Sequence, residues 1–182
     1  MSKITKAVFP VAGLGTRFLP AAKAIPKEML PIIDKPLIEY AVEEAVLAGI
    51  TEIIFITSHT KRAIEDHFDQ NFELDKKLIQ SGKHDYLEKI NRKIFTDVKF
   101  TYVRQKSQNG LGDAILHARH LINDEAFAVL LADDLIINNP SCTEQLIDAY
   151  QKTSSTVIGL NKVPEEETNK YGVISSDDID SS

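Results

Sequence analysis

Short apolar segments alternate with helix-like segments along most of this chain, and this alternation is the feature that most constrains the fold. Apolar or β-branched runs of strand length occur at residues 6–12, 51–57, 98–103, 127–132 and 155–160. Between them, the pattern of apolar residues predicts helices at residues 37–48, 61–68, 111–121 and 143–152. Because strands that alternate with helices form βαβ units, we predict an α/β, Rossmann-like fold with a mixed, mostly parallel sheet and helices on both faces.

One segment, residues 71–94, interrupts the alternation. It has the pattern of two polar amphipathic helices on either side of Gly82, and its charges are mixed. We interpret it as a solvated helical insertion at the surface, with a partner-binding face as the alternative. The insertion lies within a single domain at residues 1–174, and residues 175–182 form an acidic tail, rich in Ser and Asp, that has no packing signal.

Composition excludes several classes of partner. The 182 residues carry 21 basic and 27 acidic side chains, and this net charge of −6 argues against nucleic acid, because phosphate backbones select basic surfaces. No apolar run approaches the roughly 20 residues that span a bilayer, so we expect no membrane association. Cys142 is the single cysteine, which rules out an internal disulfide and fits a reducing, cytoplasmic location best.

The loop after the first predicted strand has the composition of a phosphate-binding loop. It reads Gly-Leu-Gly-Thr-Arg-Phe-Leu-Pro at residues 13–20, and ligands of α/β sheets bind at the carboxyl ends of the strands. Two glycines let backbone N–H groups approach phosphate oxygens closely. A dinucleotide fingerprint would require glycine where Phe18 stands, and a P-loop would need four residues between its glycines. We therefore expect an extended loop that brings Arg17 to the ligand.

Two further groups have the chemistry of a phosphate site. Lys27 lies on a proline-stiffened loop, where it can act as a point charge on a phosphate, with Lys23 as a weaker alternative. Asp133 and Asp134 end the fourth predicted strand, and Mg²⁺ is commonly bound by one or two carboxylates together with substrate phosphates. Either aspartate could instead cap a turn, but their position at a strand end, opposite the glycine loop, favours a metal site.

These residues belong to a longer series of motifs. In chain order the motifs are Ala-Gly-Leu-Gly-Thr-Arg-Phe-Leu-Pro at 12–20, Lys-Glu-Met-Leu-Pro at 27–31, Lys-Pro-Leu-Ile at 35–38, Val-Arg-Gln at 103–105, Gly-Leu-Gly at 110–112, Ala-Asp-Asp at 132–134 and Lys-Tyr-Gly-Val at 170–173. The series resembles that of the sugar-1-phosphate nucleotidylyltransferases, and the resemblance covers essentially the whole chain. It implies that the domain at residues 1–174 is a nucleotidyltransferase domain.

The same resemblance implies an activity. This is the transfer of a uridylyl group from UTP to glucose 1-phosphate, which gives UDP-glucose and pyrophosphate, with Mg²⁺ as cofactor and a homo-oligomer as a possible assembly. Two alternatives stay open. One is a nucleotidylyltransferase that uses another base or sugar, and the other is a nucleotide-binding module without turnover.

The resemblance also assigns roles to individual residues. Arg17 and Lys27 would be the catalytic pair that stabilises the departing phosphates, and Asp133 would hold the metal ion. Asp134 and Gly172 would lie on the sugar side. The nucleotide would bind to the glycine loop and to two later positions, namely Ala12, Gly13, Leu14, Gly15, Thr16, Gln105 and Gly110. Gln105 would pair with uracil, because an amide offers both a donor and an acceptor.

The sequence departs from the family's pattern in two respects. Asp113 stands where histidine is common, so we expect no role for an imidazole at this position. Relatives also continue into a Glu-Lys-Pro segment, whose lysine contacts the sugar phosphate, and then to an aspartate that completes the metal site. Neither occurs before Ser182. We therefore expect an N-terminal portion, or a truncated product, of such an enzyme, which binds UTP but turns it over poorly or not at all.

Overall fold

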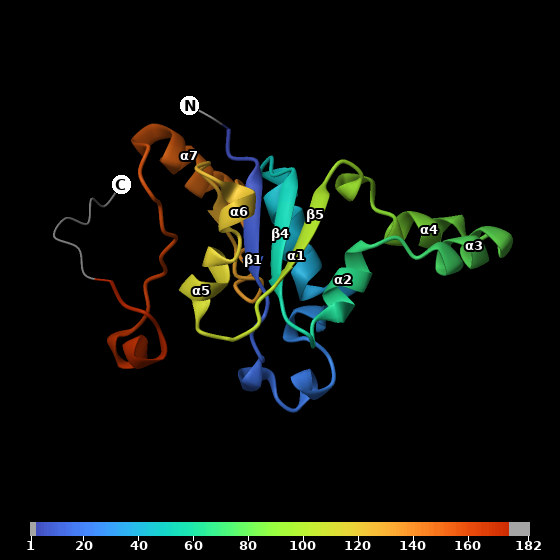
Figure 1. Ribbon diagram of the computed structural model, residues 1–182, viewed down its shortest axis with the longest axis horizontal. Coiled ribbons are helices and arrows are strands. Elements are labelled where there is room, and N and C mark those ends of the chain that lie inside the picture. The colour runs from blue at the N-terminus through green and yellow to red at the C-terminus, as the bar shows by residue number, and fades with distance from the viewer. Residues whose placement is uncertain (1–2, 175–182) are drawn as a thin grey trace.

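A sheet of four parallel strands forms the centre of the computed structural model, which describes residues 3–174 (Figure 1). In spatial order the strands are β5 (Lys99–Arg104), β4 (Glu52–Thr57), β1 (Lys6–Pro10) and β6 (Ala128–Val129). Within the described residues, antiparallel pairing is confined to a small ribbon of β2 (Pro31–Ile32) and β3 (Lys35–Pro36). The predicted α/β fold with a mostly parallel sheet is confirmed.

Helices cover both faces of this sheet. In residues 3–174 they are α1 (Leu37–Leu47), α2 (Arg62–Phe68), α3 (Phe72–Gln80), α4 (His84–Ile90), α5 (Leu111–Leu116), α6 (Arg119–Ile122) and α7 (Cys142–Thr153), with short 3₁₀ turns η1 (Thr16–Phe18), η2 (Ala21–Lys23), η3 (Lys27–Met29), η4 (Lys93–Phe95) and η5 (Glu165–Lys170). Successive strand residues point to opposite faces. Phe9 of β1 packs into a cluster with α1 and α7, whereas Val8 packs into a second cluster with α5 and α6. None of these helices has the length and apolar composition needed to cross a membrane.

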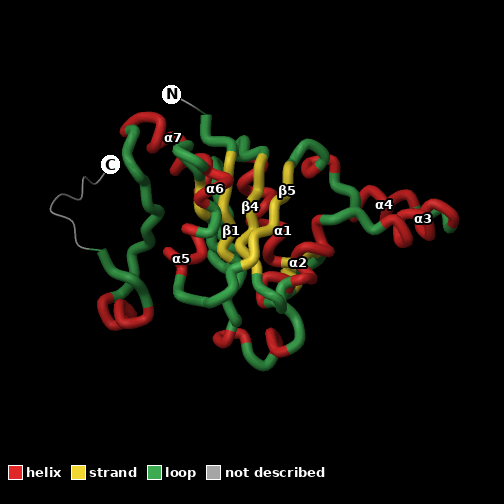
Figure 2. The backbone as a smooth tube through the Cα atoms, in the orientation of Figure 1, coloured by secondary structure: helices red, strands yellow, loops and turns green. Residues whose placement is uncertain are grey.

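The strand predicted at residues 155–160 is wrong. After α7 the chain runs as a loop along the outside of the molecule (Figure 2), and Ile158 is 66% exposed. β-branched residues form strands when a neighbouring strand or a packed face receives their side chains. Within the described residues, no strand pairs with segment 155–160. The helix predicted at 111–121 is also divided, into α5 and α6.

The segment predicted as an insertion contains two helices, α3 and α4, which project from the body as an arm (Figure 1). We refer to residues 71–91 as the arm. Gly82 lies between the helices with a φ of +66°, in the left-handed region that glycine adopts easily. The assignment of this segment as an insertion stays a prediction, and the predicted tail at 175–182 lies outside the described residues.

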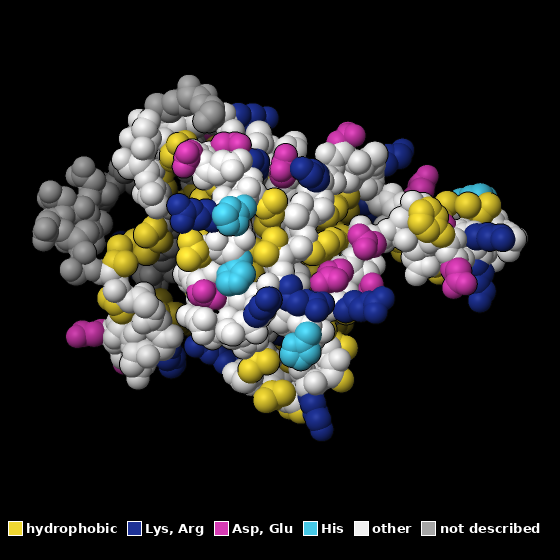
Figure 3. Space-filling model, in the orientation of Figure 1, with side chains coloured by type: hydrophobic (Ala, Val, Ile, Leu, Met, Phe, Trp, Pro, Cys, Tyr) yellow, Lys and Arg dark blue, Asp and Glu magenta, His cyan; other side chains and the backbone are white. Residues whose placement is uncertain are grey.

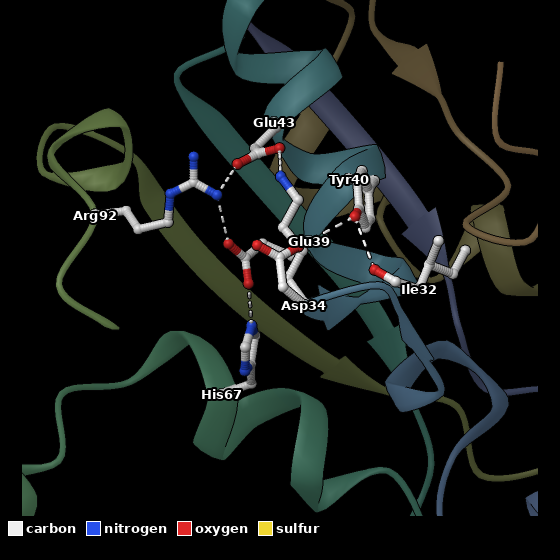
Figure 4. Close-up of polar contacts among 8 residues, drawn as sticks. Ile32, Asp34, Glu39, Tyr40, Glu43, His67 and Arg92 are labelled. Atoms are coloured by element: carbon white, nitrogen blue, oxygen red, sulfur yellow. Dashed lines mark hydrogen bonds and ion pairs between the residues drawn. The ribbon is translucent and has the colours of Figure 1, made fainter. Parts of the chain in front are cut away.

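Both ends of the arm are tied to one carboxylate, Glu39 of α1 (Figure 4). His67, in α2 before the arm, donates from Nε2 to Glu39 over 3.0 Å. Arg92, directly after the arm, donates from Nη1 to Glu39 over 2.7 Å and also pairs with Glu43. Lys35 forms an ion pair with Glu43 as well. A network of charges therefore fixes the arm to the body.

The network lowers the pKa of Glu39. Burial by itself would raise this pKa, but the hydrogen bonds and charges of His67 and Arg92 outweigh burial, and the pKa falls below its ordinary value of 4.5. A carboxyl group whose pKa is lowered in the folded state adds stability above its unfolded pKa. That stability is lost as the pH falls through the folded pKa. Glu39 therefore stabilises the fold at neutral pH and stops doing so in acid.

We expect Glu39→Gln to lower the free energy of unfolding at pH 7 by about 1.5–3 kcal/mol, the range for hydrogen bonds to charged groups. The gap to the wild type should narrow as the pH falls below 4.5, because the wild-type carboxylate then becomes protonated. Urea unfolding from pH 7 down to pH ~3 measures this. Glu88→Gln, on the exposed side of α4, is the control. A gap that is constant with pH would contradict the assignment.

Candidate active site

The candidate site lies where the order of the strands reverses. From β1 the chain proceeds to β4 and β5 on one side, and β6 is then added on the other side of β1. Loops that leave β1 and β6 at their carboxyl ends therefore diverge and leave a crevice, which is where open α/β sheets bind ligands. Figure 3 shows Lys and Arg side chains in a band across this end of the sheet.

Lys27 and Asp133 meet at this point. Lys27 lies on η3, in the long connection that follows β1, and Asp133 lies in a turn after β6. Lys27 Nζ is 2.6 Å from Asp133 Oδ2, and the two residues are 106 positions apart in sequence. Asp133 is the more accessible partner, with 38% of its side chain exposed against 17% for Lys27. The fold thus brings together the predicted phosphate-binding cation and the predicted metal ligand.

The glycine loop folds over the stem of Lys27. Gly15 has a φ of +68°, and a Cβ added to it would lie 3.2 Å from Cβ and Cγ of Lys27. Such a contact is tight, and the backbone conformation is itself costly for other residues. Gly13 differs, because nothing lies within 4 Å of the position of its missing Cβ. Of the two glycines, Gly15 is the one that the unliganded fold requires.

The different surroundings of Gly15 and Gly13 predict different costs in stability when each is replaced by alanine. Gly15→Ala should lower the free energy of unfolding by about 1–2 kcal/mol, because alanine pays for the left-handed backbone and displaces the stem of Lys27. Gly13→Ala is the matched control and should change it by no more than about 0.5 kcal/mol. Thermal unfolding without ligand measures both. Equal losses in the two variants would show that the loop backbone is held differently.

A buried ion pair fixes the turn that carries Lys27. The next residue, Glu28, accepts a hydrogen bond from Lys61 Nζ over 2.7 Å, and both side chains are almost completely buried. Lys61 precedes α2, in the loop after the carboxyl end of β4. A buried charge without its partner is costly, so this pair holds η3 firmly against the sheet.

Removing one member of the pair should lower the free energy of unfolding more than removing both charges. We expect Lys61→Met to cost about 3–5 kcal/mol of unfolding free energy, because Glu28 is left buried and unpaired. The double variant Glu28→Gln, Lys61→Met should recover part of that loss. Urea unfolding of the two single variants and the double variant gives the coupling energy. Arg62→Met, at an exposed neighbouring position, is the control, and strictly additive losses would contradict the argument.

Gln105 lies in a second loop, after β5, and the structure places this loop beside the glycine loop. Gln108 donates from Nε2 to the carbonyl oxygen of Ala12 over 2.7 Å. Gln105 is only 4% exposed, and its Nε2 donates to Asp113 Oδ2 over 2.6 Å. Gly110, with a φ of +103°, precedes α5, which carries Asp113. Ala12, Gln105 and Gly110 are thus on adjoining loops.

Within residues 3–174, no side-chain hydrogen bond or ion pair joins the other predicted site residues to the Lys27–Asp133 pair. Leu14, Thr16 and Arg17 of the glycine loop are exposed, and within residues 3–174 Arg17 has no ion-pair partner. Asp134 is exposed beside Asp133. Gly172 follows η5 on the outer segment (Figure 1), and no hydrogen bond or ion pair of the described residues connects it with the loops. Their roles stay predictions.

The site offers few protein ligands for a metal ion. In the part of the chain that the structure describes, no group of three His, Cys, Asp or Glu side chains could hold a metal ion. Asp133 offers one accessible carboxylate. Mg²⁺ is often held by one or two carboxylates, with phosphate oxygens and water as the other ligands, and Asp133 fits that arrangement.

Sequence reasoning missed three residues that shape the site. Glu28 and Lys61 look like ordinary surface charges in the sequence, because nothing in their local pattern predicts burial. Asp113 was noted only as a departure from the family's pattern. Its position in the first turn of a helix that begins soon after Gln105 is the signal that could have suggested the contact.

Comparison with known proteins assigns the chain to a family. Residues 6–181 match the family described as nucleotidyl transferase, so nearly the whole chain is covered. The chain belongs to the nucleotidyl transferase family, and the family predicted from the motif series is confirmed.

Individual relatives add detail. The UTP–glucose-1-phosphate uridylyltransferase of Bacillus subtilis (strain 168) is 55% identical over 174 residues, which are 96% of this chain and 59% of the relative. A UDP-glucose pyrophosphorylase structure from Acinetobacter baumannii has a TM-score of 0.91 at 42% identity, over 98% of this chain and 63% of its own. A UTP-bound UGPase from Acinetobacter baumannii has a TM-score of 0.79 at 46% identity, over 84% of this chain and 54% of its own. The chain spans about three fifths of the length of the curated relatives it matches.

Proposed function

We propose that the protein transfers a uridylyl group from UTP to glucose 1-phosphate and releases pyrophosphate. The observation that carries the proposal is the contact of Lys27 with Asp133 at the reversal point of the sheet, beside the glycine loop. It puts a cation and an accessible carboxylate where a phosphate chain would bind. The 55% identity to a UTP–glucose-1-phosphate uridylyltransferase supports this choice of substrates.

The proposed reaction needs no covalent intermediate with the protein. An oxygen of the sugar phosphate attacks the α-phosphorus of UTP in line, and pyrophosphate leaves. The nucleophile is already an anion, so catalysis consists of holding the two phosphates together and offsetting their charge. Lys27 and Arg17 would bind the β- and γ-phosphates, and N–H groups of Gly13, Gly15 and Thr16 would bind phosphate oxygens.

Asp133 is the residue that would hold Mg²⁺. When bound, the metal ion would supply positive charge that offsets the negative charge of the phosphates. For this to occur Lys27 must release Asp133 and turn to the phosphates, an exchange of one anionic partner for another. Asp134 and Gly172 would bind the sugar.

The base would bind between the glycine loop and the loop after β5. The backbone of Ala12 and Gly13 would lie on one side, and Gln105 and Gly110 on the other. Support comes from the hydrogen bond of Gln108 to Ala12, which closes these two loops onto each other. The side chain of Leu14, which is exposed, is free to cover the nucleotide.

We propose a cytoplasmic location and leave a homo-oligomer as a proposal from the family resemblance alone. The single cysteine supports the location. Burial, and then the nearby charge of Glu44, raise the pKa of Cys142 above its ordinary value. A thiol with a raised pKa is less often a thiolate at neutral pH and is therefore less reactive.

Calorimetry with UTP and UMP in Mg²⁺ tests the proposal. We expect Arg17→Ala to weaken UTP roughly 10- to 100-fold, in line with the loss of one charge-assisted hydrogen bond, and to leave UMP almost unchanged, because UMP lacks the distal phosphates. Lys152→Ala removes an exposed cation from α7, at a position with no predicted role in binding, and is the matched control.

Equal losses for UTP and UMP would remove Arg17 from the distal phosphates. Failure of the wild-type chain to bind UTP would overturn the proposed function. UDP-glucose is measured in the same samples after addition of glucose 1-phosphate. Its formation would support the transferase, whereas UTP binding with no product would favour a binding module.

A further inference from the structure

The orientation of the Gln105 amide is fixed by its neighbour. The NH₂ and C=O ends of an amide side chain are easily confused, because they differ little in shape. At neutral pH a carboxylate only accepts hydrogen bonds. The group of Gln105 that lies 2.6 Å from Asp113 Oδ2 must therefore be the NH₂ end, Nε2. Asp113 thus determines which end of the amide is left over.

The end left over is an acceptor. In residues 3–174, no group donates a hydrogen bond to Oε1 of Gln105. The residue as a whole is only 4% exposed, but Oε1 itself is not fully enclosed and can be reached from the surface. The backbone N–H of Gln105 donates to the carbonyl of Thr57 over 2.9 Å, which anchors the residue to the end of β4. An accessible acceptor without a protein donor can take a hydrogen bond from a ligand, so a ligand that supplies an N–H at this point would be bound preferentially.

Asp113 is itself held in place. It lies in the first turn of α5, and the N–H of the next residue, Ala114, donates to the carbonyl of Gly110 over 3.1 Å. Ala114 is buried in the cluster that contains Val8 of β1. His117 contacts Asp113 from one turn further on, with Nδ1 2.8 Å from the Asp113 carbonyl oxygen. The carboxylate is therefore presented from a helix packed on the central strand.

We propose that Asp113 is a positioning residue that sets the base selectivity of the nucleotide site. By holding Nε2 of Gln105, it leaves Oε1 as the group that reads the pyrimidine edge. Uracil and thymine have an N–H donor at position 3 and satisfy Oε1. Cytosine has a lone pair at position 3, so two acceptors would face each other. This inference rests on the proposed function, because it assumes that Gln105 contacts the base.

Substitution of Asp113 would free the amide. In Asp113→Asn the new side chain can either accept from Nε2 or donate to Oε1, so Gln105 can adopt both orientations at similar cost. In Asp113→Ala neither orientation is favoured. When the amide turns over, Nε2 faces the base and can donate to position 3 of cytosine. Both variants should therefore bind CTP better and UTP worse.

The experiment compares the dissociation constants of UTP, CTP and 2′-deoxy-UTP for the wild-type chain, Asp113→Asn and Asp113→Ala, by calorimetry in Mg²⁺. We expect the preference for UTP over CTP to fall roughly tenfold or more in both variants. The ratio between UTP and 2′-deoxy-UTP should not change, because these share one base edge. Asp148→Asn, on the exposed face of α7, makes the same chemical change elsewhere and should leave all ratios unchanged.

The outcomes separate the two ideas. A uniform loss of affinity for all three nucleotides would show a merely structural role for Asp113 and would overturn the inference. An unchanged preference for UTP over CTP in both variants, with UTP still bound, would overturn the inference alone. Absence of UTP binding by the wild-type chain would overturn the proposed function and the inference with it.

Discussion

The pairing of β1 with strands on both of its sides is the constraint from which the site follows. β1 is buried on both faces and is hydrogen-bonded in parallel to β4 and to β6, so its position and direction are fixed from both sides. Because β6 joins on the side opposite β4, the loops that leave these strands part at the end of β1. The glycine loop and the turn of Asp133 therefore face each other without any interaction of their own being needed to bring them there.

Two adjacent residues have different roles at the site: Glu28 stabilises the turn, and Lys27 is available to a ligand. Glu28 is buried against Lys61 and belongs to the body, whereas Lys27, one position earlier on the same 3₁₀ turn, reaches the accessible carboxylate of Asp133. Consecutive residues on such a turn point in different directions, so one can anchor while its neighbour stays free to meet a ligand. The position of Lys27 thus depends on the ion pair of Glu28 and Lys61, which is itself almost completely buried.

Some of this arrangement could be predicted from the sequence, and some could not. The runs at residues 6–12 and 51–57 are apolar on both faces, a pattern typical of a buried parallel strand, and strands occur there. Residues 155–160 have the same local pattern but no neighbouring strand among the described residues, and pairing is not visible in a local pattern. The burial of Glu28 likewise depends on Lys61, which is distant along the chain. The partner of Gln105 depends on where α5 begins. The periodicity of the sequence predicts neither contact.

The attachment of the arm to Glu39 has a thermodynamic consequence. His67 and Arg92 bring the two ends of the arm to a single carboxylate, so the 24 residues between them form a loop whose closure is maintained by the body. The helices inside that loop contact each other and contribute little to the two clusters that cover the sheet. Regions of this kind open and close as units of their own, at a lower free energy than the whole domain. The arm can therefore lose its helices while its two ends, and the loops at the carboxyl ends of β1 and β6, stay in place.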